Sequence, residues 1–148
     1  MRVNKTGTFE ILLVEDEPGD AELVKLALAQ GRFTCRATVA ENGCAAMSIL
    51  RKEAPYQAVP TPDLVLLDLN MPLMNGREVL KAMKADPILV VIPVVVFTTS
   101  ETERDVLASF QLGAAGFITK PLDVQEIFNV IHSVEEYWFA VVRCPKNR

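Results

Sequence analysis

Reactive side chains directly follow four apolar runs in the sequence. They are the acids Glu15, Asp16 and Asp68, the hydroxyls Thr98 and Thr99, and the amine Lys120. Three carboxylates brought close together repel one another unless a cation binds them. Because their ligand atoms are all oxygens, with no His or Cys beside them, Mg²⁺ suits this set better than zinc does.

A carboxylate beside Mg²⁺, an amine and a hydroxyl is an arrangement that receives a phosphoryl group. The cation and the ammonium of Lys120 offset the charge on the phosphoryl oxygens, and the hydroxyl of Thr98 donates a hydrogen bond. Asp68 would then be the nucleophile and would become an acyl phosphate. Any one of these residues alone is more often a solvated loop residue, so this interpretation depends on their convergence.

The elements that must bring these residues together alternate along the chain. The apolar runs predict strands at 9–14, 34–40, 64–68, 92–98 and 115–119, and helical spacing predicts helices at 20–29, 45–52, about 76–85, 101–112 and about 123–142. Strict alternation with right-handed crossovers predicts an α/β fold with a parallel sheet covered on both faces. The carboxyl ends of parallel strands share one edge, where ligand crevices form. We therefore expect the reactive side chains to converge there.

Composition limits the classes of function. The chain has 148 residues, which fits one domain, and its 15 basic and 19 acidic side chains give a net charge of −4. No basic run occurs outside the last few residues, so we expect no nucleic-acid partner. Three cysteines without metal-ligand spacing favour a reducing compartment, and no signal peptide or transmembrane run is present. We expect a cytoplasmic protein that binds no membrane and, because the chain ends at Arg148, carries no output domain.

Four motifs carry a family resemblance. "VEDEPGD", "LLDLNMPLMNGREVL", "VVVFTTS" and "AAGFITKP", in this order and spacing, resemble the receiver domains of two-component response regulators. The resemblance covers roughly residues 9–135. It implies a flavodoxin-like (βα)₅ sheet in strand order 2-1-3-4-5, with residues 1–148 as a single receiver domain. It also implies a phosphoacceptor for a partner histidine kinase rather than an enzyme.

The resemblance also implies roles for individual residues. Asp68 would be the phosphoacceptor, and Mg²⁺, with Mn²⁺ as a possible substitute, would be bound by Glu15, Asp16, Asp68 and the main-chain carbonyl of Asn70. Thr98 and Lys120 would contact the phosphoryl group, Thr99 would gate access to it, and Thr98 and Phe117 would act as switch residues. Glu15 stands where Asp is frequent, and Phe117 stands where Tyr is frequent. Pro121 matches a proline that usually follows a cis peptide bond.

Two further features narrow the resemblance. The long loop at 54–62 and the ending "EEYWF" resemble stand-alone regulators that partner cyanobacterial and bacterial phytochrome histidine kinases. A phytochrome-type kinase is therefore the implied partner, on likeness alone.

The last predicted helix has an apolar arc wider than one sheet contact requires. Phe128, Tyr137, Trp138 and Phe139 extend that arc beyond the stripe that faces the sheet. Aromatic patches of this kind mark interfaces, so we predict a homodimer contact through these four residues. The alternative is extra burial within the monomer.

Two rival functions use related elements. An aspartyl-phosphate hydrolase of the haloacid dehalogenase type also has an Asp after a strand, but it needs an acid two residues later, where this chain has Asn70. A flavodoxin-like FMN binder needs a phosphate loop rich in glycine and hydroxyls, whereas the loop here is the acidic "EDEPGD".

Overall fold

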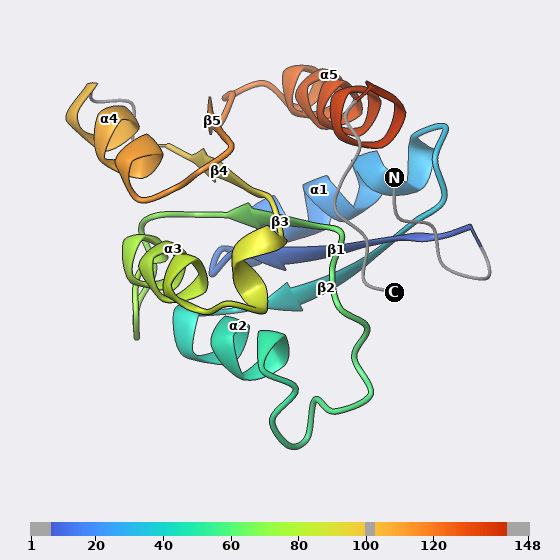
Figure 1. Cartoon of the computed structure of the whole chain (residues 1–148). Helices are drawn as coiled ribbons and strands as arrows, with labels where there is room; N and C mark the ends of the chain where they lie inside the picture. Colours follow the sequence, from blue (N-terminus) through green and yellow to red (C-terminus); the bar gives the residue numbers. More distant parts are fainter. Residues whose placement is uncertain (1–6, 100–102, 142–148) are drawn as a thin grey trace.

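The protein is built on a five-stranded parallel sheet. The computed structural model describes residues 7–99 and 103–141. The strands are β1 (Phe9–Val14), β2 (Cys35–Ala40), β3 (Leu64–Leu67), β4 (Val94–Thr98) and β5 (Gly116–Thr119). They lie in the order β2-β1-β3-β4-β5, with β1 and β3 at the centre (Figure 1). The predicted α/β class and the strand order 2-1-3-4-5 are confirmed.

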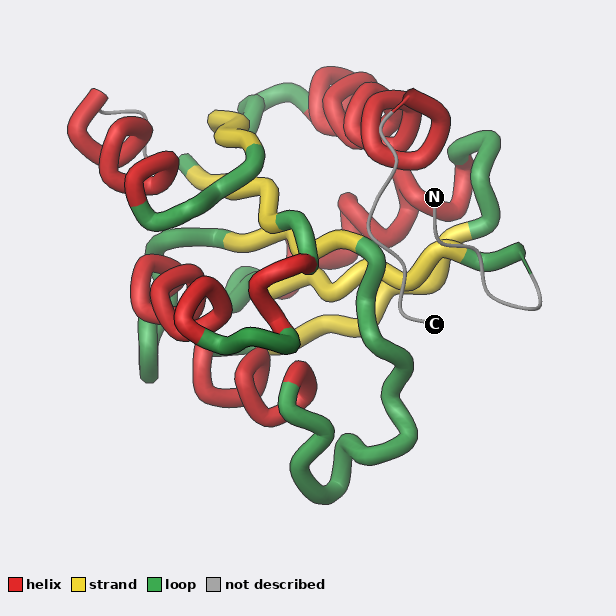
Figure 2. The backbone as a smooth tube through the Cα atoms, viewed as in Figure 1, coloured by secondary structure: helices red, strands yellow, loops and turns green. Residues whose placement is uncertain are grey.

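Helices cover both faces of the sheet. They are α1 (Pro18–Gln30), α2 (Gly43–Leu50), α3 (Gly76–Ala85), α4 (Glu103–Gln111) and α5 (Val124–Glu135), with a short 3₁₀-helix η1 (Leu89–Val91) and a π-helix η2 (Glu136–Val141). α1 and α5 lie on one face, and α2 and α3 lie on the other (Figures 1 and 2). Within the described ranges, no helix is both long enough and apolar enough to cross a membrane.

Polar side chains set the helix starts. Glu17, Asn42, Asn75 and Asp123 each accept a hydrogen bond from a backbone N–H in the first turn of the helix that follows. Such caps satisfy donors that have no partner within the helix. At the start of α3, Glu78 also reaches back to the N–H of Asn75, which completes a capping box. Local sequence therefore fixes the start of α3, the helix that follows the loop after Asp68.

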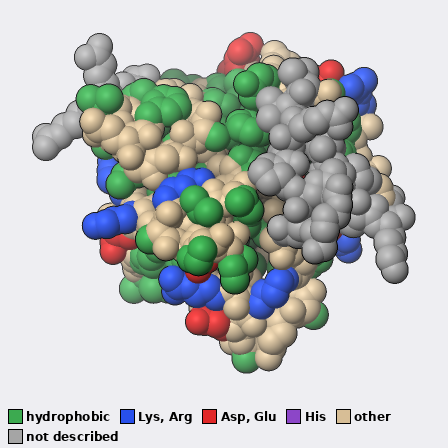
Figure 3. All heavy atoms as spheres, viewed as in Figure 1, with side chains coloured by type: hydrophobic (Ala, Val, Ile, Leu, Met, Phe, Trp, Pro, Cys, Tyr) green, Lys and Arg blue, Asp and Glu red, His purple; other side chains and the backbone are tan. Residues whose placement is uncertain are grey.

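The core has one hydrophobic cluster on each face of the sheet. Along β1, Leu12 and Val14 face α2 and α3, whereas Ile11 and Leu13 face α1 and α5. This alternation is the period of two expected of a strand covered on both sides. On the face shown in Figure 3, hydrophobic side chains also reach the surface over η1, where Ile88, Val90 and Val91 are exposed.

The C-terminal aromatic residues differ from the sequence prediction. Phe139 is only 4% exposed, and its ring stacks on Phe9 with 4.1 Å between centroids. The prediction that Phe139 belongs to an exposed dimer patch is wrong. The physical reason is the change from α-helix to π-helix at Glu136, because a π-helix bonds i to i+5 and shifts the following residues around the axis. Phe139 thereby takes the inward position that a continuous α-helix would have given to Trp138.

Glu135 is a buried acid between α5 and β2. The residue is 2% exposed, and its Oε2 accepts a hydrogen bond from Cys35 Sγ at 3.5 Å. Burial raises the pKa of the Glu135 carboxyl above its ordinary value of 4.5, with Glu136 adding to the rise and Cys35 and His132 opposing it. Burial and the neighbouring Glu135 also raise the pKa of Cys35 to about 12, so the thiol stays a donor.

The raised pKa of Glu135 predicts a pH dependence of stability. Above about pH 4.5 the unfolded state loses this proton while the folded state keeps it, so the contribution of Glu135 falls as pH rises towards its folded pKa. In urea titrations, the free energy of unfolding of the parent should fall relative to that of Glu135→Gln as pH rises above 4.5, because the glutamine has no proton to lose. Glu53→Gln, which changes an exposed acid far from Glu135 in the sequence, is the control, and equal pH profiles for all three proteins would contradict the prediction.

Candidate functional site

The ends of β1, β3, β4 and β5 meet at one edge of the sheet. Backbone hydrogen bonds fix their relative positions: the N–H of Asp68 donates to Val14 O at 3.0 Å, and the N–H of Lys120 donates to Thr98 O at 2.7 Å. Each strand therefore delivers its first residue beyond the apolar run to the same place. The Lys120–Pro121 peptide bond is trans, contrary to the implied cis bond; the cis bond among the described residues joins Ala54 to Pro55.

Asp68 is held from three directions. Thr98 Oγ1 donates to its Oδ1 at 2.8 Å, and Lys120 Nζ lies 3.3 Å from its Oδ2. The backbone N–H of Asn70 also donates to Oδ1, at 3.2 Å. Asp68 is largely buried, and Thr98 is fully buried. These contacts fix the carboxylate before any phosphoryl group arrives.

Lys120 is surrounded by carboxylates. Its Nζ lies 2.5 Å from Glu15 Oε1 and 3.0 Å from Asp20 Oδ2, in addition to Asp68. Burial acts to lower the pKa of Lys120, but the hydrogen bonds that Lys120 donates to Glu15 and Asp20, together with the charges of Glu15 and Asp68, outweigh it and raise the pKa above its ordinary value. Lys120 is therefore a permanent positive charge beside Asp68.

An acidic cluster lies next to this lysine. Glu15, Asp16 and Asp68 each offer a carboxylate oxygen, and these oxygens lie within 4.8 Å of one another. Burial raises the pKa of Glu15 to about 7, although Lys120 acts to lower it. A set of carboxylate oxygens with one exposed member, Asp16, fits a hard divalent cation that keeps part of its water. The residues present therefore fit Mg²⁺ or Mn²⁺ in their donor chemistry.

The loop after Asp68 is strained and tightly packed. Leu73 and Met74 both have left-handed backbone angles, with φ of 48° and 66°, which cost free energy for residues that carry a Cβ. A Cβ on Gly76 would overlap the carbonyl oxygen of Asp68, and a Cβ on Gly43 would overlap that of Met74. Only glycine at these two positions lets α3 and α2 approach the loop this closely.

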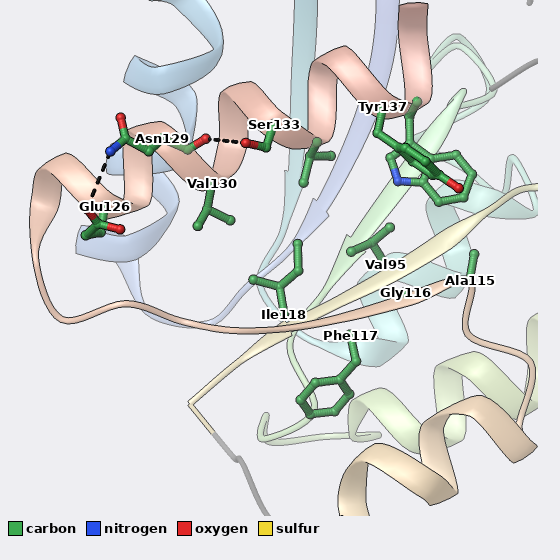
Figure 4. Close-up of a pocket in the computed structure, with 12 residues that line it drawn as sticks. Val95, Ala115, Gly116, Phe117, Ile118, Glu126, Asn129, Val130, Ser133 and Tyr137 are labelled. Atoms are coloured by element: carbon green, nitrogen blue, oxygen red, sulfur yellow. Dashed lines mark hydrogen bonds between the residues drawn. The ribbon is translucent and has the colours of Figure 1, made fainter. Parts of the chain in front are cut away.

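Of the three predicted switch and gate residues, Thr98 contacts Asp68 directly, whereas Thr99 and Phe117 do not. Thr99 is exposed at the end of β4, and Phe117 is half-buried against the hydrophobic cluster on the α3 side of the sheet. Figure 4 shows the Phe117 ring pointing away from α5. On the other side of β5, a pocket of about 610 Å³ lies between β5 and α5 and is lined by Val130, Tyr137 and Trp138, among others.

Asp20 is a site residue that the sequence did not indicate. It lies in the first turn of α1, where acids commonly stabilise the helix N-terminus without any other role. Its contact with Lys120 spans 100 residues of sequence. The fourth acid of "EDEPGD", four residues after Asp16, was the available signal.

Comparisons with known proteins agree with this geometry. The model of the response regulator receiver domain family matches residues 11–132. Response regulator Rcp1 of Synechocystis sp. is 40% identical over 135 residues, which is 91% of this chain and 92% of Rcp1. The crystal structure of the phosphorylated cyanobacterial phytochrome response regulator RcpA is 39% identical, with a TM-score of 0.90 over 94% of this chain and 99% of RcpA. The Mn²⁺-bound form of Rcp1 superposes with a TM-score of 0.87 at 39% identity, over 93% of this chain and 99% of that one.

These matches do not support the haloacid dehalogenase alternative. A family model that spans most of the chain and a relative of nearly equal length, 40% identical, both point to one class of signalling protein. The chain therefore belongs to the response regulator receiver domain family.

Proposed function

We propose that this response regulator accepts a phosphoryl group on Asp68 from a histidine kinase. The observation that carries the proposal is the position of the Asp68 carboxylate, within hydrogen-bond distance of both Thr98 Oγ1 and Lys120 Nζ. A carboxylate oxygen of Asp68 attacks phosphorus, and the P–N bond of the kinase's phosphohistidine breaks. The imidazole leaves, and the chain holds an acyl phosphate.

The neighbouring residues have distinct tasks in this proposal. Lys120 and the hydroxyl of Thr98 bind phosphoryl oxygens. Glu15, Asp16, Asp68 and the carbonyl of Asn70 would hold Mg²⁺, which supplies positive charge next to the transferring group. The four acids Glu15, Asp16, Asp20 and Asp68, with Lys120 and the divalent cation, sum to about −1. A phosphoryl group of about −2 in place of the single charge on Asp68 adds about one further negative charge.

That extra charge supplies the switch. The added negative charge attracts the two groups that already contact Asp68, which are the Thr98 hydroxyl and the Lys120 ammonium. Thr98 then exchanges Asp68 Oδ1 for a phosphoryl oxygen, and Phe117, on the adjacent strand β5, repacks with it. Thr99, exposed next to Thr98, controls access to the site.

We propose a phytochrome-type histidine kinase as the partner. The support is the similarity of this chain to RcpA, a phytochrome response regulator that is 39% identical and matches 94% of this chain. A kinase that uses ATP places the exchange in the cytoplasm. The test is phosphotransfer from purified phytochrome kinases compared with unrelated histidine kinases.

Labelling with a small phosphodonor tests the proposed function without any kinase. With acetyl phosphate and Mg²⁺ we expect one phosphoryl group per chain by intact mass, because the site itself provides the nucleophile and the charge stabilisation. Peptide mapping after borohydride reduction should place the label at Asp68, and hydroxylamine should remove it. A label on any other residue, or the absence of any label, would contradict the proposal.

We also propose that the regulator forms a homodimer through α5 and η2. Tyr137 is 54% exposed, Phe128 and Trp138 are half-buried, and Tyr137 and Trp138 line the pocket between α5 and β5 (Figure 4). Phe139 is not part of this surface, because it is buried in the monomer. A second copy of α5 would cover the exposed aromatic edge, as aromatic residues do at interface cores.

Sedimentation measures this association. Tyr137→Ala should weaken the dimer at least tenfold, as expected for a buried interfacial tyrosine, because it removes the ring that the second copy would cover. Ile88→Ala removes an apolar side chain that is 78% exposed and lies beside η1, and it should leave association unchanged. Equal dissociation constants for Tyr137→Ala and the parent would remove α5 from the interface.

A further inference from the structure

The ammonium group of Lys120 has three hydrogen-bond donors, and three carboxylates accept from them. Glu15 lies at 2.5 Å, Asp20 at 3.0 Å and Asp68 at 3.3 Å from Nζ. The Lys120 side chain is 6% exposed, so water has little access to replace a lost partner. The position of Nζ is therefore set by these three acids.

The three acids differ in what else they must do. Glu15 and Asp68 belong to the acidic cluster that fits a divalent cation, and Asp68 is also the proposed phosphoacceptor. Asp20 is absent from that cluster among the described residues. It is thus the one carboxylate partner of Lys120 in the described structure that keeps a single role when a cation binds and when Asp68 becomes an acyl phosphate.

We propose that Asp20 is a positioning residue that holds the Lys120 ammonium beside Asp68 while Glu15 and Asp68 serve the cation. This inference rests on the proposed phosphorylation of Asp68 and adds to it a residue that acts through Lys120 without touching the phosphoryl group. A lysine side chain is flexible and loses considerable rotamer entropy when it is fixed. A charge-assisted hydrogen bond from a helix that is itself packed against α5 reduces that freedom before the reaction begins.

The alternative is that Asp20 merely stabilises the N-terminus of α1. Glu17 already performs that task, because its side chain accepts from the N–H of Gly19 at 2.9 Å. Asp20 instead directs Oδ2 at a buried lysine from another element, although the Asp20 side chain itself remains 34% exposed. An acid that served only the helix terminus would have no need of this contact.

The first measurement is the rate constant for phosphorylation by acetyl phosphate at saturating Mg²⁺. We expect Asp20→Ala to be roughly fivefold slower than the parent, which corresponds to about 1 kcal/mol of activation free energy. Asp20→Glu should recover most of the rate, because it restores the charge and an acceptor. Glu22→Ala removes an exposed acid from the same helix and should match the parent.

A double-mutant cycle shows whether Asp20 acts through Lys120. In a Lys120→Ala background, whose slow residual rate is measured at high phosphodonor concentration, Asp20→Ala should have no further effect. The same fivefold loss in that background, or no loss in the parent background, would overturn the inference. Neither result would bear on phosphorylation of Asp68, which the labelled parent shows separately.

A second readout does not depend on phosphorylation. In protein labelled with ¹⁵N-lysine, the ammonium of Lys120 should give a slowly exchanging NMR signal that broadens in Asp20→Ala and returns in Asp20→Glu. The thermal midpoints of Asp20→Ala and Asp20→Glu should differ from that of the parent by no more than the thermal midpoint of the control Glu22→Ala does. An unchanged Lys120 signal in Asp20→Ala would refute the positioning role even if the parent protein proved not to be phosphorylated.

Discussion

Asp68→Asn should leave the protein folded and abolish phosphorylation completely. The asparagine amide has almost the same shape as the carboxylate, and its oxygen can still accept from Thr98 Oγ1, which lies 2.8 Å from Asp68 Oδ1. The amide is not a nucleophile, however, so no acyl phosphate can form. With acetyl phosphate and Mg²⁺, intact mass should show full labelling of the parent and none of the variant.

The controls separate lost chemistry from lost structure. The thermal midpoint of Asp68→Asn should equal or exceed that of the parent, because one of three mutually repelling carboxylates is gone. Glu53→Gln changes an exposed acid in the long loop before β3 and should be labelled like the parent. Residual labelling of Asp68→Asn at the parent's rate would mean that another residue is the phosphoacceptor.

Gly76→Ala should destabilise the fold and impair the site together. The new Cβ would overlap the carbonyl oxygen of Asp68 and lie 2.8 Å from the Cα of Leu69, and both are backbone atoms that no rotamer change can move. Either α3 or the end of β3 must shift. We expect a loss of about 2–4 kcal/mol in the free energy of unfolding, at or above the usual range for overpacking, and a slower phosphorylation rate because Asp68 moves relative to Thr98.

Gly116→Ala is the matched control for this substitution. A Cβ on Gly116 would make ordinary contacts of 3.6 and 3.7 Å with the side chain of Val95. It should change the free energy of unfolding by no more than about 0.5 kcal/mol. Urea denaturation of both variants measures the difference, and equal stabilities would show that the loop after β3 accommodates a side chain freely.

The sheet was predictable because its signals are local and mutually consistent. Short aliphatic runs such as 64–67 alternate with segments whose apolar residues recur at helical spacing. In the parallel sheet that this alternation predicts, the residues that follow each strand share one edge. The proximity of Asp68 to Thr98 and Lys120 follows from that topology without any knowledge of side-chain conformations. Their roles in phosphoryl transfer stay proposals until labelling is measured.

The features that escaped prediction depend on three-dimensional packing. The contact of Asp20 with Lys120 requires the exact placement of α1 over the end of β5, which helical periodicity does not specify. The burial of Phe139 depends on a π-helix, and amphipathic patterns assume a constant 3.6 residues per turn. In both cases residue type was visible in the sequence, but the direction of the side chain was not.

The close approach of α2 to the loop after Asp68 limits how this site can be transplanted. The backbone of that loop is held in its left-handed form at Leu73 and Met74 partly because Gly43, some thirty residues earlier, leaves room for the Met74 carbonyl. A designer who grafts residues 68–76 onto another parallel sheet must therefore import the neighbouring helix start as well. Without that helix start, the grafted loop can change its backbone conformation, and the Asp68 carboxylate no longer keeps its orientation.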